Sequence, residues 1–161
     1  MLKRTAANPI KCRFAQKQDV DFIYECLLNL FDEEGNIYKF SQTKATLFDA
    51  LFSDNPFAEC IIAEMDRVTV GILLFSVTNH NFTAFTTPGA YVHDIYVLDE
   101  YRRKGIAREL GNYLKAIAEQ RNYSRIDGII LKNNQNALAF YQNVQDISVL
   151  DYIYYMRLNL K

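Results

Sequence analysis

The residues from 102 to 107 have the types and the spacing of a phosphate-binding turn. Their sequence, Arg-Arg-Lys-Gly-Ile-Ala, carries three cations, one glycine and no acid. A helix that begins here would present main-chain N–H groups without partners and the positive end of its dipole. Gly105 leaves the main chain uncovered by a side chain. We therefore predict that the turn binds a phosphate or a pyrophosphate through main-chain amides.

This basic turn lies between a predicted strand and a predicted helix. After Pro88-Gly89, residues that favour a strand stand at Ala90, Val92, Ile95 and Val97. Apolar residues then recur at helical spacing, at Ile106, Leu110, Leu114 and Ile117. The alternative is an ordinary strand–turn–helix unit whose basic loop is simply solvated.

The unit resembles the central motif of the GNAT superfamily of acyl-CoA N-acyltransferases. That motif is Arg or Gln, two residues, Gly, one residue, and then Gly or Ala, and Arg102, Gly105 and Ala107 match it. Asn134, Ala137 and Tyr141 have the spacing of the second GNAT motif, and a helix would present all three on one face. The resemblance covers roughly residues 10–158 and is strongest from 90 to 141.

The resemblance implies acetyl-CoA as the co-substrate. In the family, the strand at Ile95 to Val97 splays from its neighbour, so that the N–H of Ile95 faces the thioester oxygen and the main chain near Val97 binds the pantetheine. The amides from Arg103 to Ala107 would hold the pyrophosphate. The predicted cofactor-binding residues are Ile95, Tyr96, Val97, Arg102, Arg103, Lys104, Gly105, Ile106, Ala107, Asn134 and Ala137.

The implied chemistry is direct attack of an amine on the thioester. By resemblance, Tyr141 is the general acid, because a hydroxyl of pKa ~10 can hydrogen-bond to a departing thiolate of pKa ~8.5. His93 titrates in the range that suits a base for the ammonium proton. With a regular pleat, His93 and Asp94 would point to opposite faces. The alternatives are a core tyrosine at 141 and a surface histidine at 93.

The acceptor is predicted to be a primary amine, either a small diamine or polyamine or an amino-acid-like molecule. The stretches LLNLFDEEG, PGAYVHDIYV and NNQNALAFY look closest to the diamine and polyamine branch of the family. Glu33 and Glu34 fall where that branch places amine contacts, and Asp94 is the third predicted substrate-binding residue. Two positions depart from the branch: His93 replaces an acid, and Gln145-Asp146 replaces Gly-Phe.

Two other functions stay open. One is a non-catalytic acyl-CoA-binding sensor or interaction module. The other is acetylation of a protein N-terminus or of a lysine. For Glu33 and Glu34 themselves, the alternative is a solvated acidic turn.

Composition excludes several classes of protein. The formal net charge of −1 argues against nucleic-acid binding. The three cysteines form no CxxC pair, so we expect neither a metal site nor disulfides. No apolar run is long enough to span a membrane, and the N-terminus lacks a secretion signal, so we expect a cytoplasmic protein. A homodimer stays open.

The length of 161 residues suits a flexible tail at 1–9 and a single domain at 10–161. The predicted fold is α/β with a GNAT-like mixed sheet of about seven strands, mostly antiparallel, with helices on both faces and a splayed central parallel pair. Strands are expected at 10–14, 57–63, 68–77, 90–97, 125–131, 147–150 and 152–158. Helices are expected at 19–32, 42–52, 106–118 and 134–142. Ser41 would cap the second helix, with Ala45, Phe48 and Phe52 inward.

Overall fold

A computed structural model of the chain describes residues 9–160, so most of the predicted N-terminal tail lies outside the described residues. The chain forms two compact units, one that ends at Ile129 and one that begins at Ile130. Within the described residues, every helix is too short or too polar to cross a bilayer.

The first unit is built on a five-stranded sheet in the order β1-β2-β3-β4-β5. The strands are β1 (Lys11–Phe14), β2 (Glu59–Met65), β3 (Val68–Thr78), β4 (Gly89–Val97) and β5 (Ile126–Gly128). All neighbours are antiparallel except β4 and β5, which are parallel because a helix connects them. Asp66 and Arg67 turn the β2–β3 hairpin with φ of 54° and 67°, the left-handed conformation that tight hairpins need.

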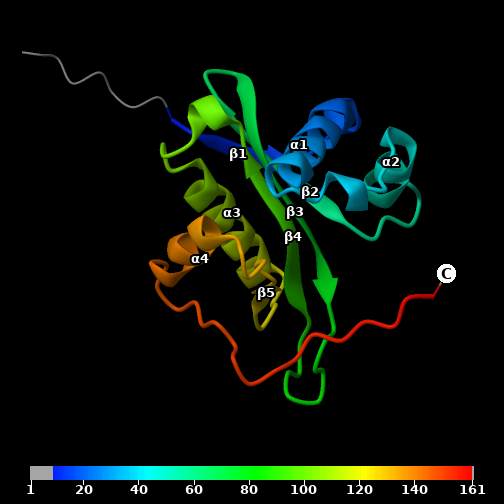
Figure 1. The fold of residues 1–161 in the computed structure, drawn as a ribbon, viewed down its shortest axis with the longest axis vertical. Coiled ribbons are helices and arrows are strands. Elements are labelled where there is room, and N and C mark those ends of the chain that lie inside the picture. The colour runs from blue at the N-terminus through cyan, green and yellow to red at the C-terminus, as the bar shows by residue number, and fades with distance from the viewer. Residues whose placement is uncertain (1–8, 161) are drawn as a thin grey trace, which may run out of the picture. The chain divides into compact units, whose positions relative to one another are not determined.

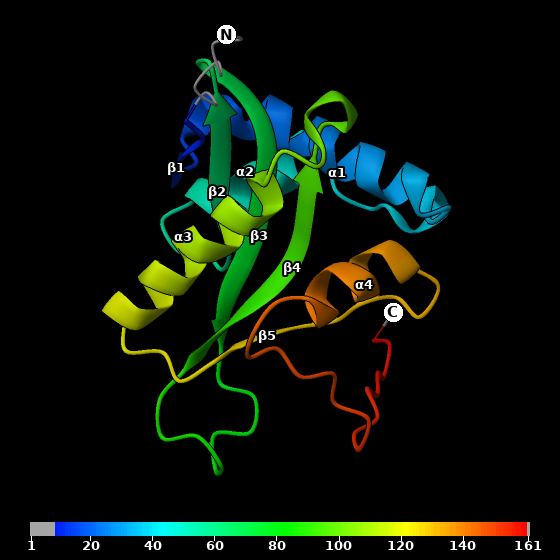
Figure 2. The same ribbon diagram turned by 90° about the vertical axis from the view of Figure 1, so that its left-hand side faces the viewer.

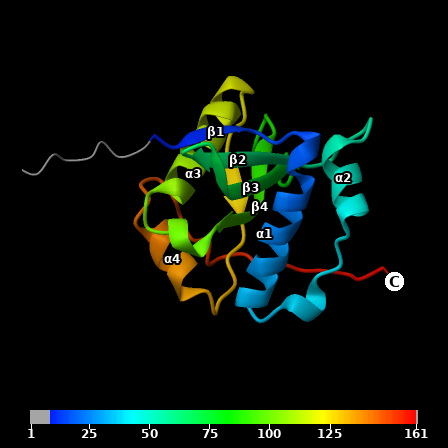
Figure 3. The same cartoon turned by 90° about the horizontal axis from the view of Figure 1, so that it is seen from above.

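Helices cover both faces of this sheet. The helices of the first unit are α1 (Val20–Glu33), α2 (Lys44–Phe52) and α3 (Ile106–Gln120). Figures 1 and 3 show α1 and α2 on one face and α3 on the other. Each face therefore has its own core. The predicted stripe of α3 is buried as expected, at Ile106, Leu110, Leu114 and Ile117. Below, the two sides of the sheet are called the α1 side and the α3 side.

The second helix differs in detail from the prediction. Thr43, and not Ser41, is the N-cap, because its hydroxyl accepts from the Thr46 N–H while the Thr46 hydroxyl accepts from the Thr43 N–H. The buried residues are Leu47, Ala50 and Leu51, so the predicted inward face is wrong. Ala45 is exposed, and Phe48 and Phe52 pack against each other at the edge of the core, where they are half-buried.

The second unit contains α4 (Gln135–Gln142) and an extended C-terminal segment. Residues 147–158 form no strand in the described part of the chain, and their apolar side chains are exposed. The mixed α/β fold is confirmed, but the two C-terminal strands are not formed, so the sheet has five strands and not about seven. Strand propensity without a partner for the main chain does not make a strand.

Candidate functional site

A β-bulge interrupts β4 at His93. Leu74 on β3 pairs with Asp94, but the next residue, Phe75, pairs with Val92, so His93 is the extra residue. Val92 and Ile95 both pack on the α3 side. Three residues apart on a regular strand, they would lie on opposite faces. The bulge has therefore reversed the alternation of every residue that follows it.

His93 and Asp94 lie on the same side of the sheet. His93 Nε2 is 2.9 Å from the Ser76 hydroxyl, and Ser76 follows Leu74 on the α1 side. Asp94 pairs directly with Leu74, which packs against the core on the α1 side, so Asp94 lies on that side as well. The prediction of opposite faces is wrong because it assumed a regular pleat.

The bulge also turns the main chain of Ile95 toward an open edge. The Leu98 N–H donates to the Val70 carbonyl on the β3 side, at 2.9 Å. Since successive residues alternate, Val97 and Ile95 point their N–H and C=O groups away from β3. On that side the β4–β5 ladder ends at Val92 and Gly128, and Figure 2 shows β4 continuing beyond it.

Ala90 shows which residues of β4 point their main-chain N–H and C=O groups toward β5 before the bulge. Its N–H donates 3.0 Å to the Arg125 carbonyl on the β5 side. Without the extra residue, Val92 and Asp94 would continue that pattern, and the Ile95 N–H would face β3. The direction of the Ile95 amide, away from β3, is therefore a product of the bulge.

The basic turn leads into the N-terminus of α3 in the predicted way. Gly105 is the N-cap with a φ of 87°, and Arg103 also has a positive φ of 59°. The Glu109 N–H donates to the Gly105 carbonyl, so the N–H groups of the residues between them have no partner within the helix. A Cβ placed on Gly105 would meet no heavy atom within 4 Å. This end of α3 thus offers amides beside open space.

Two of the three cations of the turn have partners inside the protein. Arg102 Nη2 lies 2.9 and 2.8 Å from the two Glu33 oxygens, and its Nε donates 2.9 Å to the Val97 carbonyl. Lys104 Nζ lies 4.8 Å from the centroid of the Tyr101 ring. The side chains of Arg102 and Lys104 are thus already engaged within the protein, whereas the first amides of α3 have no partner in the helix.

The titratable groups on the α1 side have shifted pKa values. Burial, and second the charge of Glu34, raise the pKa of Asp94 to about 6. Burial lowers the pKa of His93, which keeps its imidazole neutral at pH 7. Burial also raises the pKa of Tyr96 to about 12, and its hydrogen bond to Glu33 acts in the same direction.

The second motif lies on α4 as predicted. Asn134 is the N-cap, and its side-chain oxygen accepts from the Ala137 N–H at 3.0 Å. Tyr141 is half-buried in the last turn of the helix, and burial raises the pKa of its phenol. The phenol therefore holds its proton at neutral pH.

The sequence did not predict two of these contacts. The Tyr96 hydroxyl donates 2.7 Å to Glu33, across 63 residues of chain. Ser76 lies beside His93 across 17 residues. Neither pairing leaves a local signal, because both depend on strand register and on where α1 ends.

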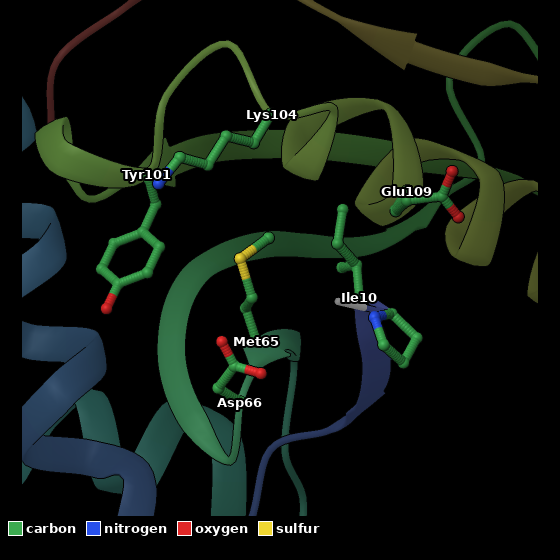
Figure 4. A pocket seen from close by; sticks show the side chains of 7 residues that line it. Ile10, Met65, Asp66, Tyr101, Lys104 and Glu109 are labelled. Carbon is green, nitrogen blue, oxygen red and sulfur yellow. The ribbon is translucent and has the colours of Figure 1, made fainter. Parts of the chain in front are cut away.

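A pocket of about 770 Å³ lies beside the basic turn, between the β2–β3 turn and the first turn of α3, and Lys104 is among its lining residues. Figure 4 shows Asp66 and Glu109 at its rim together with Lys104. Two acids against one cation make this side of the basic turn unfavourable for a phosphate, in contrast to the main-chain amides at the start of α3. Among the described residues, no group of His, Cys, Asp and Glu could hold a metal ion.

Comparison with known proteins agrees with the geometry of the fold. Residues 21–145 match the model of the acetyltransferase (GNAT) family. A thialysine N-epsilon-acetyltransferase of Caenorhabditis elegans is 27% identical over 130 residues, which cover 78% of each chain. The human spermidine/spermine N(1)-acetyltransferase-like protein 1 is 25% identical over 87% of this chain, which spans only 21% of that protein.

A solved structure shows the same fold. The crystal structure of "a possible acetyltransferase from Clostridium difficile 630" superposes with a TM-score of 0.76 at 24% identity, over 94% of this chain and 99% of the other. The predicted enzyme class, an acetyl-CoA-dependent N-acetyltransferase, is confirmed by the family match. The open strand edge beside an open helix N-terminus is thus found in a chain that belongs to the acetyltransferase (GNAT) family.

Proposed function

We propose that this enzyme acetylates the primary amine of a small cationic acceptor, either a diamine or polyamine or a basic amino acid. The observation that carries the proposal is the bulge at His93, which turns the Ile95 amide to an open edge and gathers His93 and Asp94 on the α1 side. The names of two relatives support a cationic acceptor, because thialysine, spermidine and spermine are all cationic amines.

The acetyl donor would bind along β4 and at the start of α3. The amides between Arg103 and Ala107 would hold the diphosphate, where Gly105 leaves space for it. The main chain of Val97 would pair with the pantetheine, and the Ile95 N–H would stabilise the oxyanion of the tetrahedral intermediate. Asn134 and Ala137 stay predicted contacts of the pantetheine arm.

The acceptor would bind on the α1 side. Asp94 and Glu34 supply negative charge for its ammonium groups. The attacking nitrogen must lose a proton, and we assign its removal to His93, whose lowered pKa keeps the imidazole ready as a base at pH 7. The new N–C bond would form first and give the tetrahedral oxyanion, and the C–S bond would break as that intermediate collapses to the amide. Tyr141 would give its proton to the departing thiolate.

The test is release of free thiol from acetyl-CoA by the purified protein. The amines are spermidine, ornithine, thialysine and a neutral amine of similar size. We expect release with the cationic amines and a loss of about 10²–10⁴-fold in kcat for Tyr141→Phe and His93→Ala. Tyr113→Phe is the matched control, since Tyr113 is a half-buried tyrosine of α3 that packs against Phe14.

Other outcomes would replace the proposal. Tight binding of CoA without thiol release for any amine would indicate a sensor module. Thiol release with a peptide acceptor, and with none of the small amines, would indicate a protein acetyltransferase. Full activity of Tyr141→Phe would remove the assigned general acid.

A further inference from the structure

Glu33 is the last residue of α1, and its carboxylate contacts residues at and just after the end of β4. The Tyr96 hydroxyl donates to its Oε1 at 2.7 Å, and Arg102 Nη2 contacts Oε1 at 2.9 Å and Oε2 at 2.8 Å. The Arg102 guanidinium also lies over the Tyr96 ring, 5.3 Å from its centroid. The ring of Tyr96 itself is buried, so one side of this cluster is fixed by the core.

The cluster continues into the basic turn. Arg102 Nε donates 2.9 Å to the Val97 carbonyl, and Arg102 is the residue directly before Arg103, whose φ is positive. The same arginine thus binds α1, the end of β4 and the start of the turn. Only the fork of a guanidinium can make the Val97 and Glu33 contacts together.

Glu33 and its neighbour Glu34 serve different sides of the site. Both oxygens of Glu33 are directed to Arg102, whereas the charge of Glu34 acts on Asp94. Sequence position alone suggested the same role for both acids. The hydrogen bonds of Glu33 therefore tie it to the basic turn through Arg102.

We propose that Glu33 is a positioning residue for the acetyl donor, acting through Arg102, and that it does not bind the amine. It holds Arg102 in the one arrangement that fixes the turn from Arg103 to Gly105 before CoA binds. This inference rests on the proposed function for the identity of the ligand. Glu34 and Asp94 stay the predicted contacts of the acceptor.

The expected effect is on affinity more than on stability. The Glu33 and Arg102 side chains are 44% and 37% exposed, and exposed ion pairs contribute little to folding. A turn that must be ordered on binding, however, weakens the affinity of its ligand. We expect Glu33→Ala to raise the Kd of CoA by about 5–10-fold and to leave the KM of the amine within about twofold.

Two further variants separate positioning from simple charge. Arg102→Lys keeps the positive charge but loses the planar guanidinium, so we expect it to lower the affinity for CoA about as much as Glu33→Ala does. Tyr96→Phe removes one hydroxyl from a buried ring and should weaken CoA by about two- to threefold without unfolding. Glu59→Ala is the matched control, because Glu59 makes a bidentate ion pair with Arg121 away from this cluster.

Hydrogen exchange in the ligand-free protein gives a second readout. The amides from Arg103 to Ala107 should exchange faster in Glu33→Ala and Arg102→Lys, and at the wild-type rate in Glu59→Ala. If the wild type does not bind CoA, the proposed function fails, and the exchange rates alone decide whether Glu33 orders the turn.

Three results would overturn the proposal. The first is a rise in the amine KM of Glu33→Ala with the Kd of CoA unchanged, since Glu33 would then contact the acceptor. The second is full CoA affinity in Arg102→Lys, since charge alone would then suffice. The third is a lower melting temperature with unchanged CoA affinity and exchange, since Glu33 would then be merely structural.

Discussion

Asp94 on β4 shares the α1 side of the sheet with Glu34, and burial together with the charge of Glu34 raises the pKa of Asp94 to about 6. Two acids that repel each other are unfavourable when no cation lies between them. A cation between them would relieve the repulsion and let Asp94 ionise. The repulsion between these two carboxylates thus lies where a bound cationic acceptor would offset it.

The first prediction concerns the pH dependence of stability. The pKa of Asp94 is about 6 in the folded state, above the ordinary value of about 3.9, so folding favours the protonated acid. The stability that this gives is present below about pH 4 and is lost as the pH rises through 6. Asp94→Asn should therefore be more stable than the wild type at pH 7.5, by roughly 1–3 kcal/mol.

Denaturation in urea between pH 5 and 8 measures this difference. The difference in unfolding free energy between Asp94→Asn and the wild type should shrink as the pH falls below 6. Asp54→Asn, in the exposed loop after α2, is the control and should show no such trend. A gap of the same size at every pH would contradict the assigned pKa.

The second prediction concerns Gly105. A side chain at its φ of 87° is strained, so Gly105→Ala should lose about 1 kcal/mol of stability. The new Cβ would also enter the open space beside the amides of α3, so the Kd of CoA should rise by about tenfold or more. Calorimetry with CoA measures the second effect separately from the first.

Gly35→Ala is the matched control for this prediction. Gly35 has a φ of 67°, and a Cβ there would also meet no atom within 4 Å. The two variants should lose similar stability. If both lost CoA affinity equally, general strain and not the lost space at Gly105 would be the cause.

Local sequence predicted the elements that depend on local rules. The stripe of α3 and the glycine at its start follow from helical spacing and from left-handed geometry, and both are in place. The bulge at His93 could not be predicted, because it depends on the register between β3 and β4. The Tyr96–Glu33 contact depends in turn on that bulge and on the last residue of α1.

The C-terminal segment shows the opposite failure. Residues 147–158 have strong strand propensity, and the strands predicted there are not formed in the described chain. Propensity describes how well a side chain fits a sheet, and it does not supply a neighbouring strand.

The third prediction concerns Gly111 in the middle of α3. A Cβ there would meet no heavy atom within 4 Å, and the backbone is helical. Gly111→Ala should therefore stabilise the protein by about 0.5–1 kcal/mol through helix propensity. Urea denaturation measures this gain in the free energy of unfolding. Gly71→Ala is the contrasting variant, since its Cβ would lie 2.9 Å from the Tyr96 carbonyl oxygen, and it should destabilise the protein. A loss of stability in Gly111→Ala would show that α3 is crowded there.

The last prediction concerns the Asp19 carboxylate, which is buried at the start of α1. Arg13 Nη1 and Nη2 lie 2.7 and 3.0 Å from its two oxygens, and the Gln16 N–H donates to it at 2.7 Å. The hydrogen bond from Arg13 lowers the pKa of Asp19 below its ordinary value. This pair ties β1 to the first turn of α1, the helix that ends at Glu33 and Glu34.

Asp19→Asn should cost about 2 kcal/mol at pH 7, because Arg13 loses one of its two charged partners and keeps only Glu64. For a lowered pKa, the stability is present above about pH 4 and is lost as the pH falls through the folded value. The difference in unfolding free energy from the wild type should therefore close in acid, as it does for Asp94→Asn, but with the opposite sign, because Asp19→Asn is the less stable protein at pH 7. Asp21→Asn, which removes an exposed pair with Lys44, should have a much smaller effect. A loss for Asp19→Asn that persisted unchanged below pH 3 would mean that its carboxylate contributes by packing and not by charge.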